Sequence, residues 1–240
     1  MTFGIANNVK SQVVQVCTPE LLNQALDSPL VGRVCAEIKD ALEKKQRGEI
    51  TPQEYEDIKG SMKKQLPILT PHATFRNGRR KNEDAIPSGL SIYDLDHIPN
   101  PEGRWEEIEP RKEELGIVMA HITPSTEGLR LIFIIPHGMT LAQAQAWMAQ
   151  QLGDTHYDQC VKDYARCSFV VPRDYILFMD EEKMFKERES TQTENSLSTP
   201  LSLCDTSPVS GEESVTTVSS SYPSTYQDIP YPLIIEVLEE

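Results

Sequence analysis

The chain has 240 residues, a formal net charge of −14 at pH 7 and 38% hydrophobic residues, a composition typical of one sizeable domain with appendages. It has no apolar run long enough to span a membrane and no signal-peptide pattern at its start, which predicts a cytoplasmic protein that does not act at a membrane. Its five cysteines include no C-x-x-C pair, which argues against a disulfide framework and a zinc ribbon.

The negative charge is concentrated towards the carboxyl end. Residues 181–240 contain 12 acidic and 3 basic side chains, whereas residues 1–180 contain 25 acidic and 20 basic ones. The acidic total therefore does not exclude a nucleic-acid groove in the first 180 residues.

Residues 1–62 read as a strand followed by helices that pack on a core. Valines predict a short strand over 10–16, and apolar spacing predicts helices over 20–27 and 30–47. A capping-box sequence at 51–54 opens a third helix. These helices have ordinary amphipathic faces and carry no predicted chemistry.

The most basic stretch of the chain follows, interrupted by prolines and a glycine. Its six basic residues are Lys63, Lys64, Arg76, Arg79, Arg80 and Lys81. A loop of this kind binds phosphate backbones by charge, or it is a solvated surface loop. Because it leads into a strand that ends in two acids, we predict nucleic-acid binding by Lys64, Arg76, Arg79 and Arg80.

Residues 89–98 alternate apolar with small or polar residues, as a half-buried strand does, and this strand ends in two acids. Side chains of a strand alternate between faces, so Asp94 and Asp96 point the same way and Leu95 turns into the core. Two adjacent carboxylates suit a hard divalent cation such as Mg²⁺ or Mn²⁺. The alternative is a polar strand end at which both acids face water.

Two apolar runs, 116–122 and 129–136, are joined by a short polar turn and predict a β-hairpin. Arg130 is the charged residue of the second run. Burying an arginine is costly without a partner, and Asp94, Asp96 or a bound triphosphate could supply one. The alternative is an arginine that extends from the strand start to water.

After the acid pair, a polar turn over 99–103 leads into a short acidic helix expected from Trp105 to Leu115. The remaining elements are a helix that Thr140 caps, running to Leu152, and a pair of short strands that ends near Met179. Residues 188–225 are rich in Ser and Thr and predict a disordered linker. An ordered pattern resumes at 226–240, which indicates a docking segment or the start of a further element.

Three features, in this order, resemble the virulence-protein-E amino-terminal domain of bacterial mobile elements. They are the acid pair, the S-x-x-G-L-R turn at 125–130 and the D-x-x-x-K-D-x-x-R-x-S-F segment at 158–169. That domain stands in front of primase-like and helicase-linked proteins and is similar to the archaeo-eukaryotic primase superfamily. The resemblance covers residues 63–180. It implies an α+β fold, with an RRM-like antiparallel sheet of a primase-polymerase core over 63–187, flanked by helices.

The resemblance also implies roles for single residues. Asp94, Asp96 and Asp158 match the three acids that hold the metals and carry catalysis. Ser125, Gly128 and Arg130 occupy the nucleotide-binding turn, and Arg130 stands where polymerising members carry His. Arg166 matches a basic position of the third motif and is the last of the expected phosphate-binding residues. Asp163 is its expected ion-pair partner.

The implied function is two-metal nucleotidyl transfer in the replication of a mobile element, with Mg²⁺ or Mn²⁺ as cofactor. Nucleoside triphosphates, a single-stranded DNA template and a helicase or primase C-terminal module would be the partners. Arginine offers fixed charge but cannot replace the acid–base role of a neutral imidazole. A catalytically inactive nucleic-acid-binding or partner-docking module is therefore the alternative, and a nuclease or nucleotide hydrolase would use the same acids.

Overall fold

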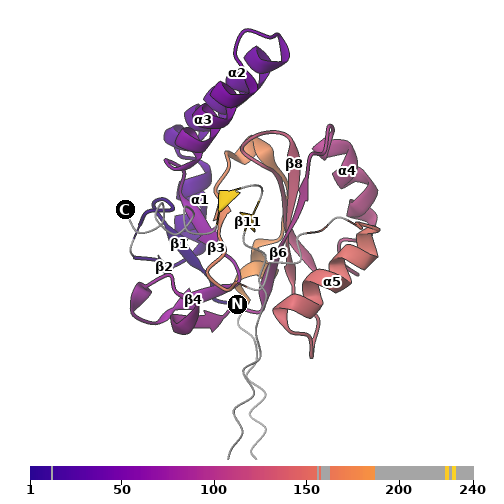
Figure 1. Ribbon diagram of the computed structural model, residues 1–240. Coiled ribbons are helices and arrows are strands. Elements are labelled where there is room, and N and C mark those ends of the chain that lie inside the picture. Colours follow the sequence, from indigo (N-terminus) through magenta and orange to yellow (C-terminus); the bar gives the residue numbers. More distant parts are fainter. Residues whose placement is uncertain (12, 156, 158–162, 187–224, 227–228, 231–240) are drawn as a thin grey trace, which may run out of the picture. The chain divides into compact units, whose positions relative to one another are not determined.

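The structure is a computed structural model that describes residues 1–11, 13–155, 157, 163–186, 225–226 and 229–230. The chain divides into two units, Met1–Thr191 and Gln192–Glu240 (Figure 1). The described part of the second unit is a pair of antiparallel strands, β11 (Thr225–Tyr226) and β12 (Ile229–Pro230). Of the predicted linker 188–225, residues 188–224 lie outside the described residues, as does most of 226–240.

Two sheets form the first unit as far as the structure describes it. The first has the order β2-β1-β3-β9 and consists of β2 (Gln15–Val16), β1 (Gly4–Ala6), β3 (Ile68–Thr70) and β9 (Ser168–Phe169). The second has the order β10-β7-β8-β6 and consists of β10 (Ile176–Met179), β7 (Ile117–Ile122), β8 (Gly128–Ile134) and β6 (Leu90–Asp96). A smaller ribbon pairs β4 (Ala73–Phe75) with β5 (Ala85–Pro87).

The predicted strand and hairpin at the centre of the chain are confirmed. β6 pairs antiparallel with β8, and β8 pairs antiparallel with β7. The turn between β7 and β8 contains Thr126 in the left-handed region, at φ 60°. β6 is the outer strand of its sheet, so the two acids lie at an edge.

Helices surround these sheets, and their bounds follow from local capping. The long ones are α1 (Pro19–Leu26), α2 (Pro29–Gln46), α3 (Pro52–Lys63), α4 (Pro101–Ile108) and α5 (Leu141–Leu152), with a short α6 (Glu181–Phe185). The capping box at Thr51 and the helix cap at Thr140 are present as predicted, and Thr140 also forms a capping box with Gln143. Single turns of 3-10 helix occupy Arg76–Gly78, Asn82–Asp84, Glu109–Arg111 and Arg173–Tyr175.

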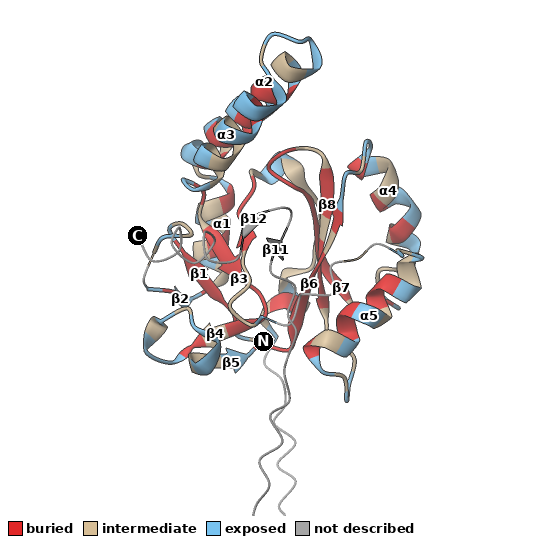
Figure 2. Ribbon diagram, in the orientation of Figure 1, coloured by how far each residue is buried: buried red, intermediate tan, exposed pale blue. Residues whose placement is uncertain are grey.

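The second sheet is buried on both faces, by different partners. α4 and α5 cover one face, where Trp105 and Met148 pack on Tyr93, Leu95 and other apolar side chains. The opposite face packs against the first sheet and α1 (Figures 1 and 2). Asp94 and Arg130 point to this second face, where Arg130 binds both Asp94 and Ser168 of β9 in the first sheet.

The α+β class with antiparallel sheets and flanking helices is confirmed, and two local predictions are wrong. The helix expected from Trp105 begins at Pro101, because Asn100 accepts a hydrogen bond from the Gly103 N–H and caps it. Of the described residues in the strand expected over 10–16, Gln15–Val16 form one, and β1 at Gly4–Ala6 was not predicted. Gly4 permits that strand, because a Cβ there would clash with Thr70 Oγ1 and Val14 Cγ1. Within the described residues, no helix is long and apolar enough to cross a membrane.

Candidate functional site

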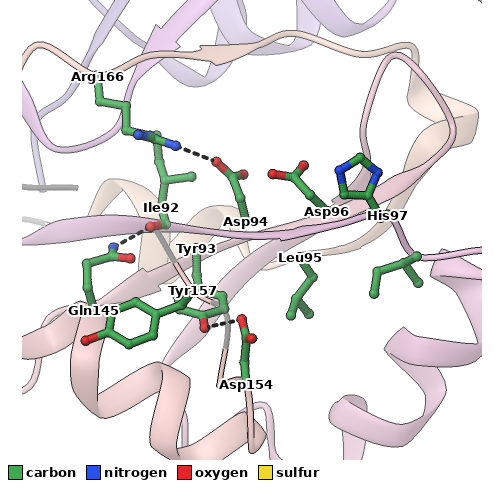
Figure 3. Close-up of a pocket in the computed structure, with 11 residues that line it drawn as sticks. Ile92, Tyr93, Asp94, Leu95, Asp96, His97, Gln145, Asp154, Tyr157 and Arg166 are labelled. Atoms are coloured by element: carbon green, nitrogen blue, oxygen red, sulfur yellow. Dashed lines mark hydrogen bonds and ion pairs between the residues drawn. The ribbon is translucent and has the colours of Figure 1, made fainter. Parts of the chain in front are cut away.

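The acid pair lies at the outer edge of the second sheet. Asp94 and Asp96 project from one face of β6 and Leu95 from the other, as the alternation predicts (Figure 3). Leu95 is buried among apolar side chains. The Asp94 side chain is 11% exposed, whereas Asp96 is an exposed residue. The two carboxylates therefore have different surroundings although they are neighbours.

Arg130 pairs with Asp94. The two residues are opposite each other on β8 and β6, and Arg130 Nε donates to Asp94 Oδ1. Because the Arg130 side chain is only 14% exposed, it does not extend to water. Of the partners that the sequence suggested for this arginine, the structure selects Asp94.

Arg166 adds a second positive charge to the same carboxylate. Its Nη2 lies 3.2 Å from Asp94 Oδ2 (Figure 3). Burial alone would raise the pKa of the Asp94 carboxyl, but the charges and hydrogen bonds of Arg130 and Arg166 outweigh this and hold the pKa below its usual range. Asp94 is therefore ionised and neutralised on both oxygens.

The expected partner of Arg166, Asp163, has another role among the described contacts. The Asp163 side chain accepts from the Ala165 backbone N–H at 2.7 Å, and its carbonyl accepts from the Arg166 N–H at 3.3 Å. These bonds form the turn that leads into β9. Between described residues, Arg166 forms an ion pair with Asp94 and none with Asp163, so that prediction is corrected.

A cavity of about 310 Å³ opens beside the acid pair. Its lining comes from β6, α5 and the segment after α5, and includes Asp94, Asp96, Asp154, Tyr157 and Arg166 (Figure 3). The Tyr93 hydroxyl donates to Asp154 Oδ2 at 2.7 Å. The cavity thus has charged groups at one side and aromatic and polar groups at the other.

The turn residues Ser125 and Gly128 lie at the Asp96 end of β6 and outside the cavity lining. Ser125 Oγ is 3.2 Å from Thr123 Oγ1, a contact within the turn. Gly128 is opposite Asp96, and a Cβ there would lie 3.0 Å from the Leu95 carbonyl oxygen. The close approach of the two strands explains the glycine without a ligand.

The basic segment is mostly at the surface. Lys64, Arg76 and Arg79 are exposed, whereas Arg80 is half-buried and donates to the Val9 carbonyl at 2.9 Å. Lys63, for which no separate role was predicted, is half-buried at the end of α3. Burial lowers the pKa of its ammonium group, and Arg130 acts in the same direction while Asp96 opposes it. Lys63 is therefore within electrostatic reach of Asp96 and Arg130.

The fit of a metal ion depends on a residue that the structure does not describe. Asp158 lies outside the described residues. Among those that are described, no group of three or more His, Cys, Asp or Glu side chains could hold a metal ion. The described part of the site supplies two adjacent carboxylates, of which Asp94 already has two arginine partners.

One family model matches the chain. It is the BT4734-like, N-terminal domain, and it matches residues 61–171, a span that includes the acid pair, the hairpin and Arg166. No curated protein and no solved structure matches the chain.

Proposed function

We propose that this chain is a primase-polymerase-like module that binds nucleoside triphosphates and single-stranded nucleic acid in the replication of a mobile element. The observation that carries the proposal is the neutralisation of the buried Asp94 by Arg130 and Arg166 beside the cavity. Two arginines that share one carboxylate can also bind phosphate oxygens, for which the planar guanidinium is well suited.

In this proposal the arginines exchange partners when a nucleotide enters. Arg130 and Arg166 would turn part of their hydrogen bonding from Asp94 to the phosphates, which leaves the carboxylates of Asp94 and Asp96 to face the cavity. Asp94 and Asp96, with Asp158 as the proposed third acid, would hold Mg²⁺ or Mn²⁺. A bound divalent ion would supply charge neutralisation at the triphosphate and activation of a hydroxyl group.

The order of elements supports a primase-like core. From β6 to α5 the chain runs β-α-β-β-α, the order in which a ferredoxin-like or RRM-like sheet begins. The motif order gives the same indication, because the acid pair ends the first of these strands and Arg130 lies on the third. The exposed Lys64, Arg76 and Arg79 are proposed to contact the template backbone.

A second candidate is a catalytically inactive nucleic-acid-binding module on the same fold. The observation that favours it is that Arg130 stands at the position of the motif histidine and binds Asp94. A guanidinium there offers charge without an acid–base function.

The test is incorporation of labelled deoxynucleoside triphosphates on a single-stranded template with Mn²⁺ by the full chain. We expect incorporation that is lost in the variants Asp94→Asn and Asp96→Asn and kept in Lys44→Gln. Lys44 lies on α2, where its side chain is 43% exposed and pairs with Asp40. Template binding without incorporation by the unaltered chain would replace the first proposal by the second. Shortening of the template or release of free phosphate would indicate a nuclease or a nucleotide hydrolase.

A further inference from the structure

His121 is a buried histidine whose protonated nitrogen can be assigned from its partners. It lies on β7 opposite Arg130 and is 1% exposed. Its Nδ1 is 2.9 Å from the Ile122 carbonyl oxygen. A carbonyl oxygen only accepts, so Nδ1 carries the hydrogen, and in the neutral ring Nε2 is then an acceptor.

Ser168 connects this ring to Arg130. The Ser168 Oγ lies 3.4 Å from His121 Nε2 and 3.1 Å from Arg130 Nη1. The guanidinium can only donate, so the hydroxyl oxygen accepts from it and its own hydrogen is free for another partner. The Phe169 carbonyl, at 3.5 Å, is the other acceptor in reach, but a bond to it would leave the buried Nε2 without a donor. The hydroxyl therefore donates to His121.

His72 is a second buried histidine in which both ring nitrogens have hydrogen-bond partners. It follows β3 and is 1% exposed. Its Nε2 accepts from the Ile92 N–H at 3.0 Å, because a backbone N–H can only donate. Its Nδ1 then carries the hydrogen and donates to the Asp163 carbonyl at 2.9 Å. The ring therefore connects Ile92 of β6, which is two residues before Asp94, with the turn that leads to Arg166.

We propose that His121, acting through Ser168, and His72 are positioning residues that hold Arg130 and Arg166 around Asp94. Each ring is neutral, is protonated at Nδ1 and has both nitrogens engaged, so neither ring is available to a nucleotide. Ser168 lies on β9 of the first sheet, and His72 lies two residues after β3 of the same sheet. Asp94 and Arg130 lie on β6 and β8 of the second sheet. Through the two histidines, the position of the first sheet therefore fixes where the two arginine side chains lie. The inference rests on the proposed phosphate-binding role of these arginines.

The first experiment is nitrogen-15 NMR of the full chain labelled at histidine and arginine. We expect both buried rings to show the Nδ1-protonated tautomer at pH 7, and a slowly exchanging Arg130 Nε–H. The variant Ser168→Ala removes the acceptor of Arg130 with little change of volume, and should accelerate exchange of that Nε–H about tenfold. An Nε2-protonated His121, or unchanged exchange in Ser168→Ala, would overturn the inference whether or not a ligand binds.

The second experiment measures binding of inorganic tripolyphosphate. Ser168→Ala and His121→Leu should weaken binding about threefold to tenfold, whereas His121→Gln keeps one donor and one acceptor and should restore it. Arg130→Gln is the reference. If Arg130→Gln weakens binding but folded Ser168→Ala and His121→Leu bind like the unaltered chain, the positioning role is wrong. If Arg130→Gln has no effect, the proposed function fails instead, and the NMR result still decides the tautomers.

Discussion

Asp94 and Arg130 occupy opposite positions on β6 and β8, and their side chains form an ion pair on the face of the sheet that α4 and α5 leave uncovered. The pair is nearly buried, so removing one partner leaves a charge that water cannot solvate well. Arg166 shares the carboxylate, which moderates this cost.

We therefore expect Arg130→Gln to lower the free energy of unfolding by about 3 kcal/mol. Urea denaturation would measure the change. A matched control is Arg173→Gln, which breaks a pair with Asp27 in which the side chains are 48% and 57% exposed. That change should cost much less than Arg130→Gln, because an exposed ion pair contributes little to stability. Equal losses in the two variants would mean that the Asp94 pair is as well solvated as the control.

The two buried histidines predict a stability that falls in mild acid. Burial lowers the pKa of His72 and of His121 from 6.5 to about 4, with nearby arginine charges acting in the same direction. The unfolded chain therefore takes up protons first as the pH falls below 6.5, and the loss of stability is complete near pH 4. Each ring should contribute roughly 2–3 kcal/mol to the difference between pH 7 and pH 4.5.

Urea unfolding at these two pH values would measure this difference. The variant His121→Gln should remove about half of it, because its side chain does not titrate. A His121→Gln profile as steep as that of the unaltered chain would show that this ring has the same pKa in the folded and the unfolded protein.

Gly128 and Gly32 predict opposite outcomes for the same substitution. In Gly128→Ala the new Cβ would lie 3.0 Å from the Leu95 carbonyl oxygen and 3.2 Å from Thr123 Cγ2. We expect a loss of about 1–3 kcal/mol, because the paired strands must separate. Gly32 lies within α2 with nothing within 4 Å of its Cβ position, so Gly32→Ala should stabilise by about 0.5–1 kcal/mol. Thermal denaturation of both variants tests the assigned strand contact, and stabilisation by Gly128→Ala would contradict it.

The exposed arginines predict a change in the salt dependence of single-stranded DNA binding. Replacing Arg76 and Arg79 by Gln should reduce the slope of log K against log salt concentration by about 0.7 for each lost phosphate contact. Fluorescence anisotropy with an oligothymidylate at several salt concentrations measures the slope. Lys44→Gln serves as control. A slope that Arg76→Gln and Arg79→Gln leave unaltered would remove this segment from the proposed interface.

The central elements could be predicted because their signals are local. The alternation in β6, the two apolar runs around a polar turn, and the helix cap at Thr140 each act over a few neighbouring residues. The start of α4 was missed because Pro99-Asn100-Pro101 resembles a turn, although proline is well tolerated in the first turn of a helix. β1 was missed because three residues give no periodicity.

The site was predictable only in part, because only some of its residues are identified by local sequence signals. Asp94 and Arg130 are recognisable because charges at the end of buried strands need partners. The roles of His72, His121 and Ser168 depend on how two sheets meet, and their partners are 91 and 47 residues away in the chain. One signal was available: His121 interrupts an otherwise apolar strand, where a polar group needs hydrogen-bond partners.

The alternation of β6 has a consequence for how relatives of this chain can differ. Asp94 and Asp96 lie on the same face of β6 as Leu90 and Ile92, because their positions differ from those of Leu90 and Ile92 by two, four or six residues. Leu90 packs in the core on that face. Removal of a single residue within that strand would turn both acids towards Trp105 and Met148, and would bring Leu95 to the arginines. The length of the loop between β6 and α4 is under no such restriction. Insertions and deletions should therefore accumulate in the loops between elements. Within β6 and β8 the alternation of residues between the two faces should be kept.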